Sequence, residues 1–463
     1  MKSSHEASLK RGEAIPLAIA LASAGIALSG QWFWISIYFG FFTLRDSLSG
    51  IAVFAGLIGY AAYLLQLWAG RKAKAVLRLT LLLALMYLVS QIVKGYFDTE
   101  EMASAIKVLL LVVSMALAAW TGLKWSEGTW SNFIRASIAA CLIFTVSFPL
   151  IGWATRINVK PVFNLGFLKE QAGIPKNVLM LLLDEMSPEL ADPVVQAVSS
   201  NLKYVQNSTI EAAGRSTANV IPAMLTGKRF DEVMPCGSTT ICSRNASLDF
   251  SQLRMANETI DIIGFQQPYC AIQGMRSCQQ QITQEHSIVR VLYDLVCNNL
   301  LSISECSFFM KKAFSRNGKV EETTKINQAV AVNQRLTQAI LLAPFWNKGG
   351  TLYAHLFTPH PLGVISSQSL AEEYKQNMDQ AAELVKGMVV QLRQRFGDEF
   401  IIVVTSDHPL RVDWWCRGPI YGGPDCAKGL PENKGRVPFI IGSPKKFEPV
   451  NVTSNLGLLV DMP

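Results

Sequence analysis

Five long apolar segments in the first third of the chain constrain its fold more than any other feature. Each is about long enough to cross a bilayer as a helix. Half of the 463 residues are hydrophobic, which is too many for a single soluble globule. The segments are Ile15–Ile37, Ile51–Trp68, Leu77–Val93, Ala105–Leu123 and Phe133–Trp153. We therefore predict a transmembrane bundle of five helices over residues 1–153, with four or six helices as the alternatives.

Charges between the apolar segments predict which way the helices run. The N-terminus and the loops after the second and fourth segments are basic, whereas the loop after the third carries Asp98, Glu100 and Glu101. Because basic residues concentrate on the cytoplasmic side of a membrane, we expect a cytoplasmic N-terminus. Five crossings then place everything after Trp153 outside, whereas an even number of helices would leave it in the cytoplasm.

The cysteines independently indicate that the region after Trp153 lies outside the cytoplasm. Of nine cysteines, Cys141 lies in an apolar segment and eight follow Trp153. These eight form four close couples: Cys236 and Cys242, Cys270 and Cys278, Cys297 and Cys306, and Cys416 and Cys426. None has the C-x-x-C spacing of a zinc ribbon, and an even number in one soluble region indicates disulfides in an oxidising compartment. We expect each couple to pair within itself because it closes a short loop.

The net charge of +7 does not indicate a nucleic-acid partner. The basic residues gather between the apolar segments, where the orientation of membrane helices requires them, and they form no stripe. We therefore expect a membrane-embedded chain that binds no nucleic acid.

After the apolar third, the sequence changes to an α/β pattern. Residues 154–176 have the character of a linker with a few amphipathic positions that could lie on the membrane surface. The runs Asn177–Leu183 and Phe400–Ser406 are mostly apolar and of strand length, which is typical of parallel strands buried on both faces. We predict an α/β domain over residues 177–463 with a central, mostly parallel sheet.

Three stretches of this second domain carry residues suited to a metal-dependent reaction. The two apolar strands end in Asp184-Glu185 and in Asp407-His408, and α/β sheets carry their sites at the carboxyl ends of strands. Thr217 begins a short predicted helix, where free N–H groups and the helix dipole stabilise an alkoxide or a phosphate. Together these side chains suit zinc or manganese, although each of the acidic residues and Thr217 could alone be an ordinary helix cap.

In this order, the motifs resemble the alkaline phosphatase superfamily. They read Asn-Val, an apolar run and Asp-Glu, then Ser-Thr-Ala-x-x-Ile-Pro, then Thr-Ser-Asp-His. With its apolar first third and its cysteine-rich second domain, the chain looks most like the membrane-anchored phosphoethanolamine transferases of Gram-negative bacteria. More distantly, it is similar to the lipoteichoic acid synthases. The resemblance implies an alkaline-phosphatase-like, that is sulfatase-like, fold for residues 177–463.

The resemblance also implies roles for individual residues. A zinc ion, or alternatively manganese, would be held by Glu185, Thr217, Asp407 and His408. Thr217 would be the nucleophile, and Asp184 is a candidate extra ligand because sulfatases use an acidic pair there. His360 matches the place of a family histidine that contacts phosphate or a second metal. His355 is expected to face the core.

The implied reaction is a transfer in two steps. Thr217 attacks the phosphorus of a membrane phospholipid and releases diacylglycerol, and lipid A or a cell-surface glycan then takes the phosphoethanolamine group. One alternative is a phosphoglycerol transferase that acts on periplasmic glucan or surface polysaccharide. Another is a non-catalytic, sulfatase-like assembly protein. The resemblance further implies a monomer in the bacterial inner membrane, with several membrane crossings and a periplasmic catalytic domain.

The chain departs from the family pattern in two places. Pro409 stands where the family has a glycine, and no histidine follows His408, whereas phosphoethanolamine transferases carry one downstream. The missing histidine could be replaced by Arg411, Asp413, Lys434 or Arg436. The C/S-x-P-x-R motif of sulfatases is absent, so we expect no sulfatase activity.

Overall fold

The computed structural model divides the chain into two compact units between Ala154 and Thr155. The described residues are 2–39, 44–96, 127–157, 161–163, 165–169, 175–243, 246–256, 258–281, 332–361, 369–417, 421 and 425–460. The first unit is helical, and the second is an α/β unit that also includes Tyr38.

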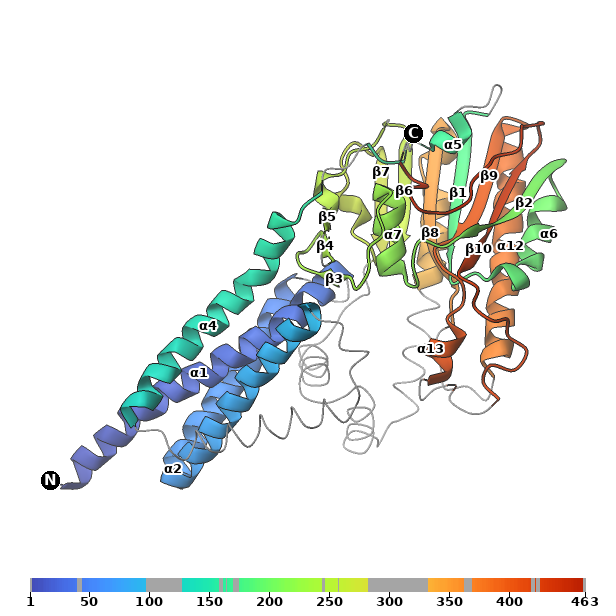
Figure 1. Ribbon diagram of the computed structural model, residues 1–463. Coiled ribbons are helices and arrows are strands. Elements are labelled where there is room, and N and C mark those ends of the chain that lie inside the picture. The colour runs from blue at the N-terminus through green and yellow to red at the C-terminus, as the bar shows by residue number, and fades with distance from the viewer. Residues whose placement is uncertain are drawn as a thin grey trace. The chain divides into compact units, whose positions relative to one another are not determined.

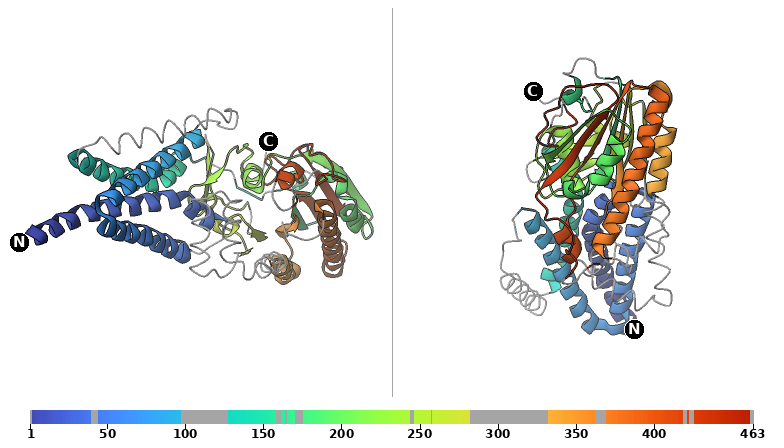
Figure 2. Two further views of the ribbon diagram at one scale, coloured as in Figure 1. Left: turned by 90° about the horizontal axis from the view of Figure 1, so that it is seen from below. Right: turned by 90° about the vertical axis from the view of Figure 1, so that its right-hand side faces the viewer.

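The described part of the helical unit consists of α1 (Lys2–Tyr38), α2 (Leu44–Tyr96) and α4 (Glu127–Ala154). The second and third apolar segments both belong to α2, and the basic stretch between them is helical rather than the predicted loop. Alanine, lysine and arginine in that stretch are strong helix formers, and no proline interrupts them. Figure 2 shows that α2 bends sharply near its middle, so the two segments form separate arms. The fourth segment lies outside the described residues.

Two stretches of the described helices are long and apolar enough to cross a membrane, Ile15–Tyr38 and Ser47–Trp68. Ala75–Leu85 is a shorter apolar stretch of the same kind. Leu57 and Trp68 expose 56% and 87% of their surface, which suits a lipid environment better than water. The predicted bundle of five helices stays a prediction, because these stretches account for only part of it.

Small residues let α1 and α2 pack closely. Ala20 and Ala24 of α1 and Ala62 of α2 are buried in one apolar cluster. A Cβ atom on Gly59 of α2 would lie 3.3 Å from the carbonyl oxygen of Ala18, closer than an ordinary van der Waals contact. Small residues allow this approach between helix backbones in membranes, so the contact between α1 and α2 suits helices packed in a bilayer.

A seven-stranded sheet organises the α/β unit (Figure 1), in the order β2-β10-β9-β1-β8-β6-β7. Its strands are β1 (Asn177–Asp184), β2 (Tyr204–Glu211), β6 (Ile260–Phe265), β7 (Ser277–Gln281), β8 (Thr351–Pro359), β9 (Phe400–Ser406) and β10 (Arg436–Ser443). Neighbouring strands from β9 to β7 are parallel, whereas β10 is antiparallel to both β9 and β2. The sheet is therefore mostly parallel, and the prediction of a mixed α/β domain is confirmed.

Smaller elements complete the unit. A second sheet contains β3 (Met234–Pro235), β4 (Thr240–Cys242) and β5 (Ser247–Asp249). The helices are α5 (Gly166–Lys169), α6 (Asp192–Ser199), α7 (Thr217–Thr226), α11 (Phe345–Lys348), α12 (Leu370–Phe396) and α13 (Val412–Arg417), with another over residues 332–342. A capping box begins α12, in which Ser369 and Glu372 satisfy each other's backbone N–H groups.

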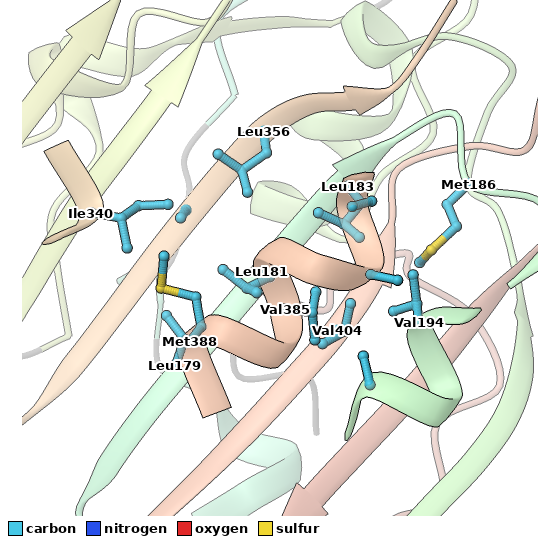
Figure 3. Packing of buried hydrophobic residues seen from close by; sticks show 14 of the residues in the cluster. Leu179, Leu181, Leu183, Met186, Val194, Ile340, Leu356, Val385, Met388 and Val404 are labelled. Carbon is cyan, nitrogen blue, oxygen red and sulfur yellow. The ribbon is translucent and has the colours of Figure 1, made fainter. Parts of the chain in front are cut away.

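The apolar run of β1 is explained by burial on both faces of the sheet. Leu179 and Leu181 belong to the cluster beneath α12, and Met180 and Leu182 belong to a cluster on the opposite face. Figure 3 shows Val385 and Met388 of α12 packed over the first pair. Because successive residues of a strand point to opposite faces, both sets must be apolar, and the run shows no alternation.

The start of the second unit differs from the expected linker. Val162, Phe163 and Leu168 are buried in the cluster opposite α12. The backbone N–H of Val162 donates to Arg254 at 2.8 Å. The few apolar positions that suggested a membrane-surface segment are thus occupied in packing against the α/β unit.

Disulfides staple the α/β unit as predicted. Cys236 pairs with Cys242, Cys270 with Cys278, and Cys416 with Cys426. The fourth predicted pair, Cys297 and Cys306, lies outside the described residues. Cys141 is buried in the helical unit and belongs to none of these bridges.

Candidate metal centre

The two acidic strand ends meet because β1 and β9 are neighbouring parallel strands. Their register pairs Leu183 with Ser406, so Asp184 and Asp407 leave the sheet side by side. Both carboxylates are buried, and His408 is fully buried beside them. The carboxyl edge of the sheet thus gathers two acids and an imidazole, as the sequence predicts.

Thr217 is the first residue of α7 rather than its cap. Ser216 precedes it in an extended conformation and bonds through its hydroxyl to the side chain of Asn219. At the other end of the helix, Gly227 adopts a left-handed conformation with φ of 69°. Because Thr217 does not cap the helix, its hydroxyl is available for contacts across the edge of the sheet.

The Thr217 hydroxyl lies within reach of all three side chains. Its Oγ1 donates to Asp407 Oδ2 at 2.7 Å and lies 3.4 Å from both Asp184 Oδ1 and His408 Nε2. His408 Nε2 is 3.4 Å from Asp407 Oδ2 and 3.7 Å from Asp184 Oδ1. We call Asp184, Thr217, Asp407 and His408 the site cluster.

The site cluster fits a divalent cation. One ligand atom from each of Asp184, Asp407 and His408 lies within 4.8 Å of the others. Asp184 Oδ2 is buried and accepts no hydrogen bond from the described part of the chain. Burial first, and then the charges of Asp407 and Glu185, raise the pKa of Asp184 well above its ordinary value. A cation between the carboxylates would remove this penalty, and two carboxylates, an imidazole and a hydroxyl are ligands that zinc accepts.

The imidazole of His408 is oriented for such a role. Its Nδ1 lies 3.1 Å from the carbonyl oxygen of Pro409, so a proton on Nδ1 leaves the lone pair of Nε2 facing the site cluster. In metal-binding histidines, the N–H of the second ring nitrogen commonly donates to a carbonyl oxygen in this way. The replacement of the family glycine by Pro409 is compatible with this contact, because it uses only the carbonyl.

Glu185 is not part of the site cluster, contrary to the ligand set that the resemblance implies. Its backbone is left-handed, with φ of 60°, and its carboxylate accepts from Arg411 Nε and, at 2.8 Å, from Trp415 Nε1. Burial raises its pKa, but the charges of His360, Arg411 and His408, together with the hydrogen bond from Trp415, hold the pKa of Glu185 below its ordinary value. The residue that occupies the expected position is Asp184, which the resemblance suggested only as an extra ligand.

His360 lies beside Glu185 rather than in the site cluster. Its Nδ1 is 2.6 Å from the carbonyl oxygen of Pro361, and its ring packs on Phe357 and Trp415. It lines a cavity of about 430 Å³ between α12 and the helix over residues 332–342. The structure therefore gives His360 no contact with Thr217 within the described residues, and its predicted role in catalysis stays a proposal.

His355 faces the core, as expected. It is fully buried, and its Nδ1 lies 3.0 Å from the Tyr269 hydroxyl. Burial lowers its pKa to about 4, which keeps the ring neutral at physiological pH.

Asn455 supports the site cluster, and the sequence alone gave no signal for it. Its amide donates to the carbonyl oxygen of Asp407 at 2.8 Å, and its Oδ1 accepts from the backbone N–H of Ala213 at 2.7 Å. A single buried side chain thus ties the end of β9 to the segment before Thr217. Ser406 adds a second tie, because its hydroxyl donates to the carbonyl of His408 and accepts from Met186 N.

None of the candidates for the missing downstream histidine enters the site cluster. Arg411 is paired with Glu185, and Asp413 lies in the first turn of α13. Lys434 and Arg436 line a different cavity on the same unit.

A scan against protein-family models and a search of curated proteins found no match. Solved structures do show similarity. A protein in the alkaline phosphatase superfamily from Vibrio parahaemolyticus is 13% identical, over 67% of this chain and 72% of that chain, with a TM-score of 0.31. Lipooligosaccharide phosphoethanolamine transferase A from Neisseria meningitidis is an integral membrane protein. It is 12% identical over 93% of this chain and 76% of that chain, with a TM-score of 0.34.

The C-terminal periplasmic domain of EptC from Escherichia coli, in complex with zinc, is 14% identical over 65% of this chain and 84% of that chain, with a TM-score of 0.31. The solved structures similar to this chain thus include members of the alkaline phosphatase superfamily, the group that its sequence motifs resemble.

Proposed function

We propose that the protein is a metal-dependent transferase that moves the phosphoethanolamine group of a membrane phospholipid to lipid A or a cell-surface glycan. The observation that carries this proposal is the position of the Thr217 hydroxyl, 2.7 Å from Asp407 in a buried cluster suited to a cation. A hydroxyl next to buried carboxylates at the start of a helix is the arrangement expected of a nucleophile for phosphoryl transfer.

The side chains of the site cluster would have different roles in this reaction. Asp184, Asp407 and His408 would hold a divalent cation, zinc or manganese, with Thr217 as the fourth ligand. When bound, the cation would lower the pKa of the hydroxyl and offset the charge of the phosphate. Asp407 orients the hydroxyl through its short hydrogen bond and is placed to accept the proton. The N–H groups of Asn219 and Val220 bond to the carbonyl oxygen of Ser216, so the start of α7 at Thr217 and Ala218 would be the part that favours the phosphate oxygens.

The bonds balance over two steps. In the first, Thr217 Oγ1 forms a bond to phosphorus, the bond from phosphorus to the diacylglycerol oxygen breaks, and that oxygen takes a proton. In the second, an acceptor oxygen attacks phosphorus, the bond to Thr217 breaks, and the threonine oxygen regains a proton from the acceptor. The protein contributes alignment and charge neutralisation rather than covalent chemistry beyond Thr217.

Membrane anchoring supports a lipid donor. Two stretches of α1 and α2 are long and apolar enough to span a bilayer, which a phosphatase of soluble substrates would not need. We infer a bacterial inner-membrane protein, a monomer with five crossings, a cytoplasmic N-terminus and a periplasmic catalytic unit. The three disulfides among the described residues of the α/β unit support an oxidising compartment for it.

The test uses purified full-length protein in detergent with labelled lipids and no acceptor. We expect diacylglycerol to accumulate from phosphatidylethanolamine. We expect a metal chelator to prevent this accumulation. Release from phosphatidylglycerol instead would favour a phosphoglycerol transferase. Consumption of neither lipid would contradict a lipid donor, and the absence of bound metal as well would favour a non-catalytic protein.

A further inference from the structure

A cavity without formal charge lies in the α/β unit between α12 and the helix over residues 332–342. Its volume of about 430 Å³ is within the range of roughly 300–1,000 Å³ that is typical of small-molecule sites. No carboxylate, lysine or arginine occurs among its described lining residues, and burial lowers the pKa of His360, which keeps that ring neutral at neutral pH. We call it the amide cavity, because its lining includes the carboxamides of Asn333, Gln334, Gln338, Asn377 and Gln380.

The two helices that border the amide cavity run in the same direction, from the carboxyl edge of the sheet to its amino edge. The first turns of α12 lie at the carboxyl edge, where the Tyr374 hydroxyl donates to the carbonyl oxygen of Glu185 at 2.7 Å. The last turn of α12 packs against α11, with the rings of Phe396 and Phe345 5.1 Å apart. The helix over residues 332–342 leads into α11, and α11 leads into the start of β8. Both helices therefore run opposite to β8.

Along this direction, the lining of the amide cavity changes from polar to apolar on all three elements. The helix over residues 332–342 places Asn333 toward the carboxyl edge and Leu341 about 12 Å further along its axis. On α12, Asn377 comes first and Leu384 last. In β8, which runs the other way, the apolar Leu356 precedes the polar residues of the lining. The amide cavity is therefore polar at the carboxyl edge of the sheet and apolar at its other end.

The polar end of the amide cavity lies next to the site cluster. Asp184 is in register with Pro359, the last residue of β8, so the two are roughly one strand spacing, about 4.8 Å, apart. His360 follows Pro359 and lines the amide cavity. Thr217 reaches the site cluster from the other face of the sheet, because the apolar side chains of α7 pack in the cluster opposite α12. The nucleophile and the amide cavity thus flank the carboxyl edge from opposite faces.

This arrangement suits a leaving group in the amide cavity. In phosphoryl transfer, the attacking and leaving oxygens lie roughly in line on phosphorus, so the leaving group departs on the side opposite to the nucleophile. We propose that the amide cavity binds the diacylglycerol part of the donor lipid during the transfer and after its release. This inference rests on the proposed function. The glycerol would occupy the polar end, and the first carbons of the acyl chains would contact the leucines.

The chemistry of diacylglycerol matches the lining. Diacylglycerol carries no charge, and carboxamide N–H groups can donate to its ester oxygens. Asn333 Oδ1 is buried and accepts no hydrogen bond from the described part of the chain. The hydroxyl that diacylglycerol gains when its bond to phosphorus breaks is a donor for this atom, and a buried acceptor without a donor is unfavourable. The leucines at the other end suit alkyl chains.

Binding is tested on full-length Thr217→Ala protein in detergent, so that no transfer competes. The probe is dioctanoylglycerol with a photoreactive diazirine at the end of one acyl chain, and mass spectrometry identifies the labelled peptides. We expect label in the helix over residues 332–342 and in α12, reduced about tenfold by an excess of unlabelled dioctanoylglycerol. Absence of such competed label from both helices would overturn the proposal.

A pair of adjacent leucines locates the acyl chains. Leu341→Asp, combined with Thr217→Ala, places a charge at the apolar end and should lower the competed label about tenfold. The matched control is Leu342→Asp, because Leu342 is 74% exposed and does not line the amide cavity. This control should keep the label. Equal labelling of the two variants would contradict the proposal.

A second comparison tests the hydroxyl of diacylglycerol. With Asn333 intact, dioctanoylglycerol should compete with the probe about fivefold better than its methyl ether, which has lost the hydroxyl donor. Asn333→Ala should remove this preference, whereas Gln394→Ala should keep it, since Gln394 is an exposed carboxamide of α12 outside the amide cavity. Equal competition by the two compounds in protein with Asn333 would contradict the placement of the hydroxyl.

These outcomes are separable from the proposed function. If the probe labels both helices but no diacylglycerol is released from phosphatidylethanolamine, the proposed transfer fails and the lipid site stands. If Thr217 takes up the labelled head group but the probe labels neither helix, the transfer stands and the assignment of the amide cavity is wrong.

Discussion

At the scale of single residues, the proposed reaction depends on the Thr217 hydroxyl as its nucleophile. Replacing Thr217 with alanine should lower turnover by at least about a thousandfold, because the nucleophile is lost. The fold should survive, since Thr217 is not the cap of α7 and alanine is a strong helix former. Diacylglycerol release and a thermal melt measure the two effects. Thr226→Ala, at the other end of α7, is the matched control and should keep its activity.

The identity of the acidic ligand gives a second prediction at this scale. Asp184→Asn should lose the bound divalent ion, because Asp184 faces the site cluster. Glu185→Gln should keep the ion but lower the free energy of unfolding by about 2 kcal/mol, because it weakens the bonds to Arg411 and Trp415. Elemental analysis and chemical denaturation distinguish the two variants. Metal loss in Glu185→Gln with retention in Asp184→Asn would reverse our assignment.

Asp184 and Glu185 show which part of the site could be predicted from the sequence and which could not. Thr217, Asp407 and His408 could be identified because each follows a recognisable element and the carboxyl ends of parallel strands converge. The choice between Asp184 and Glu185 depends on one left-handed backbone conformation, at Glu185, which no spacing rule predicts. Asn455 could not be found at all, because its bonds reach residues far away in the chain, 242 positions to Ala213 and 48 positions to Asp407.

At the scale of elements, apolar runs were the most informative part of the sequence. The strands over Asn177–Leu183 and Phe400–Ser406 were predicted because burial on both faces demands continuous apolar residues. The bend of α2 was predicted as a loop, since charge pattern reports where the chain turns but not whether the turn remains helical. The range 154–176 was predicted to be a linker, because the partners of its apolar residues Val162, Phe163 and Leu168 are found only in the folded unit.

Disulfides give a prediction for the second unit. Thiol labelling of denatured, unreduced protein should modify one cysteine, Cys141, if all four predicted couples are bridged. Reduction should destabilise the unit by about 2–5 kcal/mol for each bridge lost. Labelling of three cysteines would mean that Cys297 and Cys306 are not bridged. Labelling of five or more would contradict an oxidising compartment.

At the scale of the whole molecule, the chain should cross the membrane an odd number of times. Reporter fusions at the N-terminus and after Val460 test this, with one reporter active only in the cytoplasm and one only in the periplasm. We expect the N-terminal fusion to report cytoplasm and the C-terminal fusion to report periplasm, because of the alternating loop charges. The same compartment at both ends would require an even number of helices.

The proposed transfer from a membrane phospholipid passes through a covalent intermediate on Thr217. Its most direct test is mass spectrometry of full-length protein incubated with phosphatidylethanolamine labelled in its head group, without acceptor, and then quenched in acid and digested. We expect the peptide containing Thr217 to carry a labelled phosphoethanolamine group, and the Thr217→Ala protein to carry none. Release of diacylglycerol with no label on Thr217 would contradict it.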